Sequence, residues 1–176
     1  STMAGASLGG MSAMHAQGGL PIPDIEHVEQ PYYYDACVEA GGKIDPDEFG
    51  LKVAQSLANK IDELGEDRVA AFIAEPIMGA GGVLVAPEGY HAMVAKLCKK
   101  YDILMIADEV VTAFGRLGEW VASETVFGYV PDVLVVAKGI NSGYIPLGAA
   151  IFSRDIYEVI SQPQIDGGVF SMGFTY

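Results

Sequence analysis

The sequence predicts a mixed α/β fold in which a mainly parallel sheet is flanked by helices. Segments with helical periodicity alternate along the chain with short runs that are apolar at every position. Strands that are apolar on both faces are typical of parallel sheets, because helices cover such sheets from two sides. In addition, three consecutive apolar runs each end in an ionisable residue, and ligands of α/β proteins gather at strand ends.

The amino-terminal third is expected to begin irregularly. Residues 1–20 are rich in small residues and predict a short helix end followed by a loop. Pro21 and Pro23 favour an extended path, which residues 31–34 continue with three tyrosines in a strand or loop. We therefore expect the packed fold to start after this stretch.

The first long helix is expected to begin at Asp45-Pro46-Asp47, where an acidic N-cap residue precedes a proline in the first turn. Apolar residues then recur at helical spacing as far as Leu64, and Gly65 ends the helix. The run 69–74 is apolar throughout and predicts a buried strand, which Glu75-Pro76 ends.

The same alternation continues to the end of the chain. A second helix is expected to open at residues 87–90 and to end at Lys99 and Lys100, whose charges complement the helix dipole. Residues 111–130 read as a long mixed connection. The remaining apolar runs predict three more strands, at 103–107, 133–137 and 149–152, and a short helix is expected to start at 153–155.

Composition excludes several classes of function. Of the 176 residues, 51% are hydrophobic and 19% are charged, which excludes intrinsic disorder. The formal net charge is −13 and only 10 residues are Lys or Arg, so neither nucleic acid nor an anionic membrane surface is an expected partner. No apolar run reaches the roughly 18 residues of a membrane span. Two cysteines and no visible signal peptide favour a reducing compartment, and we expect a cytoplasmic protein.

Glu75, Asp108 and Lys138 close three successive apolar runs. A lysine at the rim of an apolar sheet can have a lowered pKa and act as a nucleophilic amine, but it can also extend to water with no further role. An acid at a strand end can equally cap the next helix. The residues alone leave both alternatives open.

Other motifs are incomplete. Gly79-Ala80-Gly81-Gly82 begins like a dinucleotide-binding loop but lacks the last glycine, so a Rossmann dehydrogenase is a distant alternative. Gly41-Gly42-Lys43 lacks the Ser or Thr and the upstream glycine of a phosphate-binding P-loop. The three histidines lie far apart in sequence, so no metal site is expected. A serine nucleophile elbow is absent.

The residues around the strand ends carry a more specific pattern when they are read together. It comprises Glu75-Pro76-Ile77, Gly79, Gly81-Gly82, Pro87, Tyr90, Asp108-Glu109-Val110, Phe114-Gly115-Arg116, Gly118, Trp120, Pro131-Asp132, Ala137-Lys138-Gly139, Gly143-Tyr144, Pro146-Leu147-Gly148 and Gly173-Phe174-Thr175-Tyr176. This pattern resembles the class III aminotransferases, which are pyridoxal-phosphate enzymes of fold type I. Within that family it looks most like the ω-amine:pyruvate group, and the resemblance spans essentially the whole chain.

The resemblance implies a role for each of five residues. Lys138 would form a Schiff base with the aldehyde of pyridoxal 5'-phosphate and, once freed by the amine substrate, would shuttle the proton. Asp108 would pair with the pyridine nitrogen, and Val110 would point the same way from an extended segment and pack on the ring. Thr175 would reach the cofactor phosphate of the neighbouring subunit. Glu75 would belong to the polar network around the ring.

Departures from the family pattern refine the expected substrate. Met172 and Ala113 replace a frequent histidine and a frequent glycine at positions that carry no cofactor chemistry. Ala80 stands where some relatives that use 2-oxoglutarate have a glutamate, which favours a pyruvate-type acceptor. Arg116 is interpreted as part of a structural ion pair, with binding of a partner carboxylate as the alternative, and Trp120 as a packing residue.

The resemblance also implies what the chain is part of. Residues 1–176 would be the central part of the large cofactor-binding domain, without the small domain and the amino-terminal phosphate loop, and would not turn over alone. The whole protein would be a homodimer or a higher homo-oligomer that moves an amino group from an amine or ω-amino acid to a 2-oxo acid. The alternatives are an aminomutase or decarboxylase with the same cofactor, and a non-catalytic relative that keeps only the fold.

Overall fold

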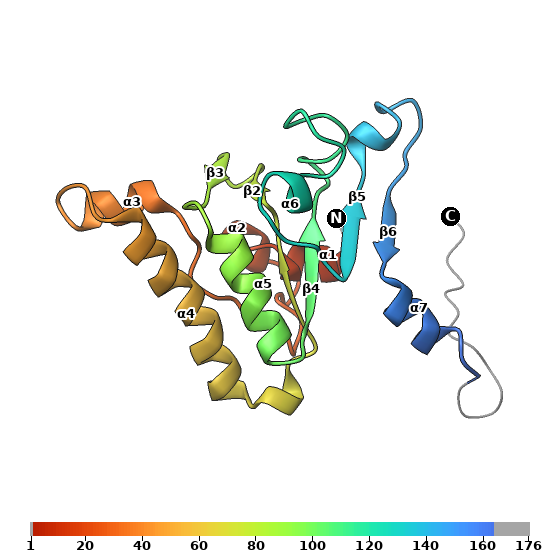
Figure 1. Ribbon diagram of the computed structural model, residues 1–176, viewed down its shortest axis with the longest axis horizontal. Coiled ribbons are helices and arrows are strands. Elements are labelled where there is room, and N and C mark those ends of the chain that lie inside the picture. Colours follow the sequence, from red (N-terminus) through yellow and green to blue (C-terminus); the bar gives the residue numbers. More distant parts are fainter. Residues whose placement is uncertain (1, 164–176) are drawn as a thin grey trace.

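A computed structural model describes residues 2–163 and shows a mixed α/β fold (Figure 1). Its main sheet has the strand order β1-β4-β5-β6. These strands comprise Ala71–Ala74, Leu104–Asp108, Val133–Val136 and Ala149–Phe152, respectively. Strand β4 runs parallel to both β1 and β5, whereas β6 is antiparallel to β5. The predicted mainly parallel sheet with flanking helices is therefore confirmed.

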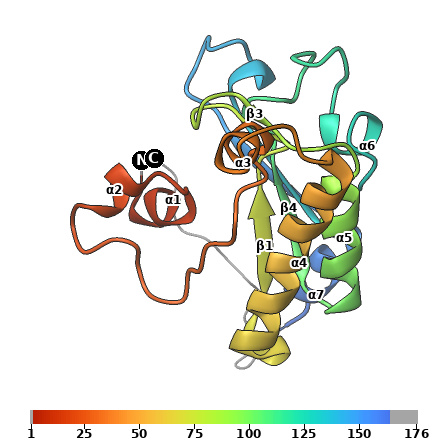
Figure 2. The ribbon, with the colours of Figure 1, turned by 90° about the vertical axis from the view of Figure 1, so that its left-hand side faces the viewer.

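Two helices, α4 (Pro46–Leu64) and α5 (Tyr90–Lys100), cover one face of this sheet (Figures 1 and 2). The predicted N-cap of α4 is confirmed. The carboxylate of Asp45 accepts hydrogen bonds from the backbone amides of Asp47 and Glu48, at 2.9 and 3.0 Å. These amides have no partner inside the helix, so the cap stabilises the first turn.

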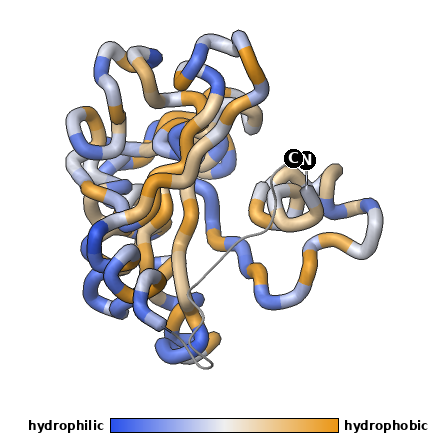
Figure 3. Tube along the Cα trace, turned by 90° about the vertical axis from the view of Figure 1, so that its right-hand side faces the viewer, coloured by the Kyte–Doolittle hydropathy of each residue, from blue (hydrophilic) through white to orange (hydrophobic). Residues whose placement is uncertain are grey.

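The hydrophobic core lies between these two helices and the sheet, and Figure 3 shows hydrophobic residues along the strands. Side chains of α4 and α5 supply most of it, and β4 with its flanking residue Ile103 and the loop residue Tyr129 supply the rest. Each Val, Leu, Ile, Phe or Met side chain contributes roughly 1.5–3 kcal/mol when it is fully buried. Members of the core include Phe49, Val53, Ala54, Leu57, Ile61, Val94, Cys98, Met105 and Ala107. Packing of α4 and α5 therefore holds β4 in place.

The amino-terminal segment lies on the opposite side of the sheet (Figures 2 and 3). It forms two short helices, α1 (Met3–Leu8) and α2 (Ser12–His15), where the sequence predicted a single helix end. The hydroxyl of Ser7 joins this segment to the chain that leaves it, because it accepts a hydrogen bond from the amide of Ile22 at 3.0 Å.

Helix α3 (Tyr33–Glu39) corrects the expectation of a strand or loop for Tyr33 and Tyr34, whereas Tyr32 precedes the helix. The hydroxyl of Tyr33 donates a hydrogen bond to the carbonyl oxygen of Ile44, and its ring lies 5.9 Å from that of Phe49. These contacts bridge distant parts of the sequence, so the local extended preference near Pro31 did not reveal them.

The remaining elements are short. Strands β2 (Ile77–Met78) and β3 (Leu84–Val85) form an antiparallel hairpin that the sequence did not predict. The connection after β4 contains an equally unpredicted helical turn, α6 (Ala122–Thr125). The others are η1 (Glu66–Arg68), η2 (Lys138–Ile140) and α7 (Arg154–Ile160). Within the part of the chain that the structure describes, every helix is too short or too polar to cross a membrane.

The imidazole side chain of His91, in α5, is buried in the fold. It is 4% exposed, and its Nε2 donates a hydrogen bond to the carbonyl oxygen of Pro76 at 2.9 Å. Burial lowers the pKa of His91 to about 4, although the bond to Pro76 partly opposes this effect. The unfolded chain takes up this proton near pH 6.5. The free energy of unfolding must therefore fall as the pH drops from about 6.5 towards 4.

We expect the folded protein to lose roughly 2 kcal/mol of unfolding free energy through His91 between pH 7 and pH 5. Urea denaturation at a series of pH values measures this loss. His91→Gln keeps an amide donor for Pro76 but does not titrate, so its stability should change less with pH. His27→Gln removes an exposed imidazole and should behave like the wild type. Equal pH dependence in all three proteins would contradict the assignment.

Candidate functional site

Parallel pairing brings three residues singled out in the sequence to one edge of the sheet. The last residue of β1 pairs with Ala107 of β4, so Glu75 and Asp108 follow at the same level. Asp108 in turn pairs with Val135 of β5, and Lys138 follows shortly after that strand. The prediction that these three residues stand at neighbouring strand ends is confirmed.

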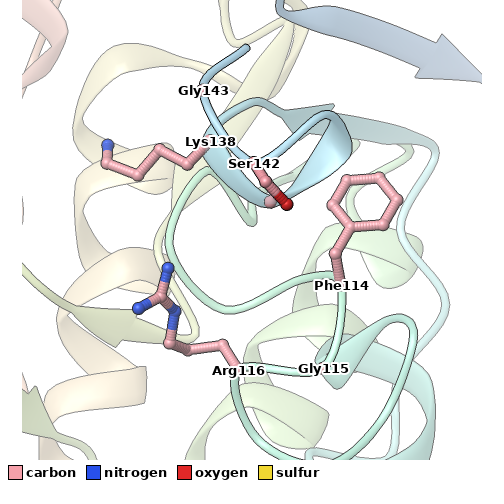
Figure 4. A pocket seen from close by; sticks show the side chains of 7 residues that line it. Phe114, Gly115, Arg116, Lys138, Ser142 and Gly143 are labelled. Atoms are coloured by element: carbon pink, nitrogen blue, oxygen red, sulfur yellow. The ribbon is translucent and has the colours of Figure 1, made fainter.

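Lys138 lines an open cavity of about 700 Å³ at this edge of the sheet (Figure 4). It is the first residue of η2, its side chain is exposed, and its φ of 46° is uncommon for a residue other than glycine. The backbone therefore turns sharply as soon as β5 ends. The cavity is lined by the loop after β4 and the turn after β5, namely by Phe114, Gly115, Arg116, Lys138, Gly139, Ser142 and Gly143.

Arg116 places a second cation in this cavity. Figure 4 shows the side chains of Lys138 and Arg116 extending towards the same side, away from the ring of Phe114. Among residues 2–163, no carboxylate lies within 4.0 Å of the Arg116 guanidinium, so the expected structural ion pair is not formed there. A ligand with negative charge would find two cations in this cavity.

Asp108 is the last residue of β4 and is half-buried. Its Oδ1 accepts a hydrogen bond from the backbone amide of Val110 at 3.0 Å. Within the described residues, Oδ2 accepts no hydrogen bond. Val110 itself lies in a turn, so the extended segment on which its prediction relied is not formed. The roles predicted for both residues stay predictions.

Glu75 has a local partner. Its Oε2 accepts a hydrogen bond from the amide of Gly79 at 2.9 Å and so links the residues on either side of β2. Trp120 is 78% exposed and meets the ring of Phe114 edge to face at 6.2 Å. Thr175 lies outside the described residues.

Gly139 and Phe114 form a close contact at the base of the cavity that the sequence analysis did not identify. A Cβ atom at Gly139 would lie 2.9 Å from the Cβ of Phe114, closer than two carbon atoms can approach. The glycine directly after Lys138 could have indicated such a contact, because glycine in this setting often permits close approach of the backbone. The partner could not be inferred, since it lies in a separate loop.

This edge of the sheet combines an amine, an acid with a free oxygen and a second cation. An accessible amine can bind a carbonyl carbon covalently, and a carboxylate can hold a protonated ring nitrogen. Asp108 stands at the end of the strand next to β5 but is not among the residues that line the Lys138 cavity.

Comparisons with known proteins are consistent with this chemistry. A family model described as "Aminotransferase class-III" matches residues 1–176. The putrescine–pyruvate aminotransferase of Pseudomonas aeruginosa is 53% identical over 176 residues, which are 100% of this chain and 37% of that protein. A chloroplastic gamma aminobutyrate transaminase of Solanum lycopersicum is 43% identical over the whole chain and 33% of its own length. The chain thus spans about a third of the length of these curated relatives.

Solved structures of transaminases also match this chain. An omega transaminase from Pseudomonas jessenii in complex with PMP has a TM-score of 0.83 and 40% identity, over 89% of this chain and 34% of that one. A thermostable (S)-enantioselective omega-transaminase from Thermomicrobium roseum has a TM-score of 0.88 and 39% identity, over 99% of this chain and 37% of that one.

The contact between Gly139 and Phe114 can be tested by compensating substitutions. Gly139→Ala should lower the unfolding free energy by about 1–3 kcal/mol, because the added Cβ overpacks this site. Phe114→Gly removes the opposing Cβ, and it also suits the φ of 58° at this position. In denaturant unfolding, Gly139→Ala should therefore lower the unfolding free energy much less when Phe114→Gly is also present. Strictly additive losses of unfolding free energy would contradict the contact.

Proposed function

The chain belongs to the class III aminotransferases, and from that premise we propose that it is the central part of the large cofactor-binding domain of such an enzyme. The enzyme moves an amino group from an amine or ω-amino acid to a 2-oxo acid such as pyruvate. The observation that carries this proposal is the placement of Lys138 and Asp108 at neighbouring strand ends, with Lys138 in an open cavity. The relatives reported above are transaminases, which favours transamination over aminomutase or decarboxylase chemistry.

The residues at the sheet edge fit pyridoxal 5'-phosphate. Its aldehyde requires an amine, which Lys138 provides, and its ring nitrogen requires an anion, which the free Oδ2 of Asp108 provides. Val110 would supply apolar contact to the ring, Glu75 would join the polar network around it, and Thr175 would bind the phosphate. When bound, this cofactor withdraws electrons from the substrate carbon that loses a proton.

Lys138 has two tasks in this proposal. It would hold the cofactor aldehyde through its amine, and once free that amine would take up and return the proton at the substrate carbon. Its exposure and its position after a sharp backbone turn support these tasks, because the side chain is not packed against the sheet. Asp108 would face the ring nitrogen and so support the electron demand of the ring.

The proposal extends to the assembly and its location. If Thr175 serves the cofactor of a neighbouring subunit, the enzyme is a homodimer or a higher homo-oligomer, and the 176-residue chain is inactive by itself. Both cysteines, Cys37 and Cys98, are free thiols, which supports a reducing compartment such as the cytoplasm.

The first experiment tests the covalent lysine. The full-length protein that carries this chain, mixed with pyridoxal phosphate, should show a visible absorption band that changes when an amine donor is added. Lys138→Ala should abolish the band and the turnover. Lys96→Ala, which removes an exposed lysine of α5, should keep both. A band that is indifferent to Lys138→Ala would refute the proposal.

The second experiment tests the amino acceptor. Ala80 lies exposed in the turn between β2 and β3 and offers no carboxylate to work with a distant arginine. We expect kcat/KM for pyruvate to exceed that for 2-oxoglutarate by about tenfold or more. Initial rates with one amine donor and both acceptors measure this ratio. An equal or reversed preference would contradict the pyruvate-type assignment.

A further inference from the structure

Glu109 is a carboxylate buried beside the proposed site, and none of the roles described above involves it. Its side chain is 0% exposed. Within residues 2–163, no Lys, Arg or His lies within 4.0 Å of its carboxylate. Burying a carboxylate is costly unless hydrogen bonds replace its water, so the donors around Glu109 must account for its place in the fold.

Three donors surround this carboxylate. Oε2 accepts hydrogen bonds from the hydroxyl of Thr112 at 3.0 Å and from the backbone amide of Ala122 at 2.8 Å. Oε1 accepts one from the backbone amide of Ser123 at 2.8 Å. The donors thus belong to two segments, one just before and one just after the loop 114–120. Bonds to a charged acceptor are the stronger kind, so this carboxylate joins the two segments firmly.

The backbone of Glu109 adds two further connections. Its amide donates to the carbonyl oxygen of Val135 in β5 at 2.8 Å, and its carbonyl oxygen accepts from the amide of Ala113 at 3.2 Å. A single residue therefore bonds to the strand that leads to Lys138 and to both ends of the loop 114–120.

That loop forms one wall of the Lys138 cavity. Its ends are closed by backbone hydrogen bonds from Phe114 to Trp120 and from Gly115 to Glu119, both of 2.9 Å. Phe114 then abuts Gly139, the residue next to Lys138. Hydrogen bonds thus connect the Glu109 carboxylate to the loop 114–120, and one close contact connects Phe114 of that loop to Gly139, next to the proposed catalytic lysine.

Tyr129 is a buried phenol close to Glu109. Burial, and then the negative charge of Glu109, raise the pKa of the Tyr129 phenol.

We propose that Glu109 is a positioning residue of the cofactor site: its buried carboxylate fixes the loop 114–120 and the strand end that carries Asp108 relative to Lys138. The inference rests on the proposed function, because it takes the Lys138 cavity as the place where the cofactor binds. Removal of the carboxylate should free the loop in the cofactor-free protein and should weaken cofactor binding, although Glu109 itself touches neither substrate nor cofactor.

The test uses the full-length protein with Glu109→Gln, Thr112→Val and Thr112→Ser, and with Glu124→Gln as the control. Glu124 is an exposed glutamate of α6, so its substitution changes charge but not the network. In the cofactor-free proteins, hydrogen exchange at the amides of Ala122 and Ser123 should be about tenfold faster or more in Glu109→Gln. Glu124→Gln should exchange like the wild type.

Cofactor binding gives the second measurement. The dissociation constant of pyridoxal phosphate should rise about tenfold or more in Glu109→Gln and roughly threefold to tenfold in Thr112→Val, which keeps the shape of Thr112 but not its donor. Thr112→Ser keeps the hydroxyl and should restore the wild-type value and the position of the visible band. If Glu109→Gln does not fold, the pair Thr112→Val and Thr112→Ser decides.

The outcomes separate this inference from the function on which it rests. Unchanged exchange at Ala122 and Ser123 would overturn the network itself. Faster exchange with unchanged cofactor affinity and band position would make Glu109 purely structural and would overturn the positioning role. A wild-type protein that gives no lysine-dependent band would instead refute the proposed function, whereas the exchange rates would still decide whether Glu109 orders the loop.

Discussion

Parallel pairing of β4 with β1 and β5 is the constraint on which the candidate site depends. The ladder places Ala74 level with Ala107 and Asp108 level with Val135, so residues from separate parts of the chain end at one edge. A shift of register by one residue would turn the side chain of Asp108 to the other face of the sheet. The core between α4, α5 and β4 opposes such a shift, because the buried Met105 and Ala107 would have to leave it.

Backbone strain gathers where the chemistry is proposed. Phe114 and Lys138 both have positive φ, of 58° and 46°, and both line the same cavity. Such conformations cost of order 1–3 kcal/mol each in residues other than glycine, so they persist only when the surroundings enforce them. The close contact of Phe114 with Gly139, together with the bonds that Glu109 makes to both ends of the loop, provides that enforcement. The contacts that hold Phe114 and Lys138 at positive φ are therefore also the contacts proposed to position the cavity wall.

Much of the fold and the members of the candidate site followed from local sequence signals. Asp45-Pro46 predicted the start of α4, and the apolar runs predicted the strands whose ends bear Glu75, Asp108 and Lys138. Two of the failures depend on contacts that lie far away in sequence. Tyr33 enters a helix because it bonds to Ile44, and Glu109 gained its network only when residues 122 and 123 folded back onto it. Val110 was placed from an extended pattern that stops at Asp108.

The two cations in the Lys138 cavity belong to a chain whose formal net charge is −13. At long range such a chain attracts ammonium compounds and repels carboxylates, whereas within the cavity the preference is reversed. Dissolved ions weaken the distant field more than the near one, since the Debye length is about 8 Å at physiological ionic strength. Added salt should therefore weaken the long-range repulsion between this chain and an anion more than it weakens the attraction inside the cavity.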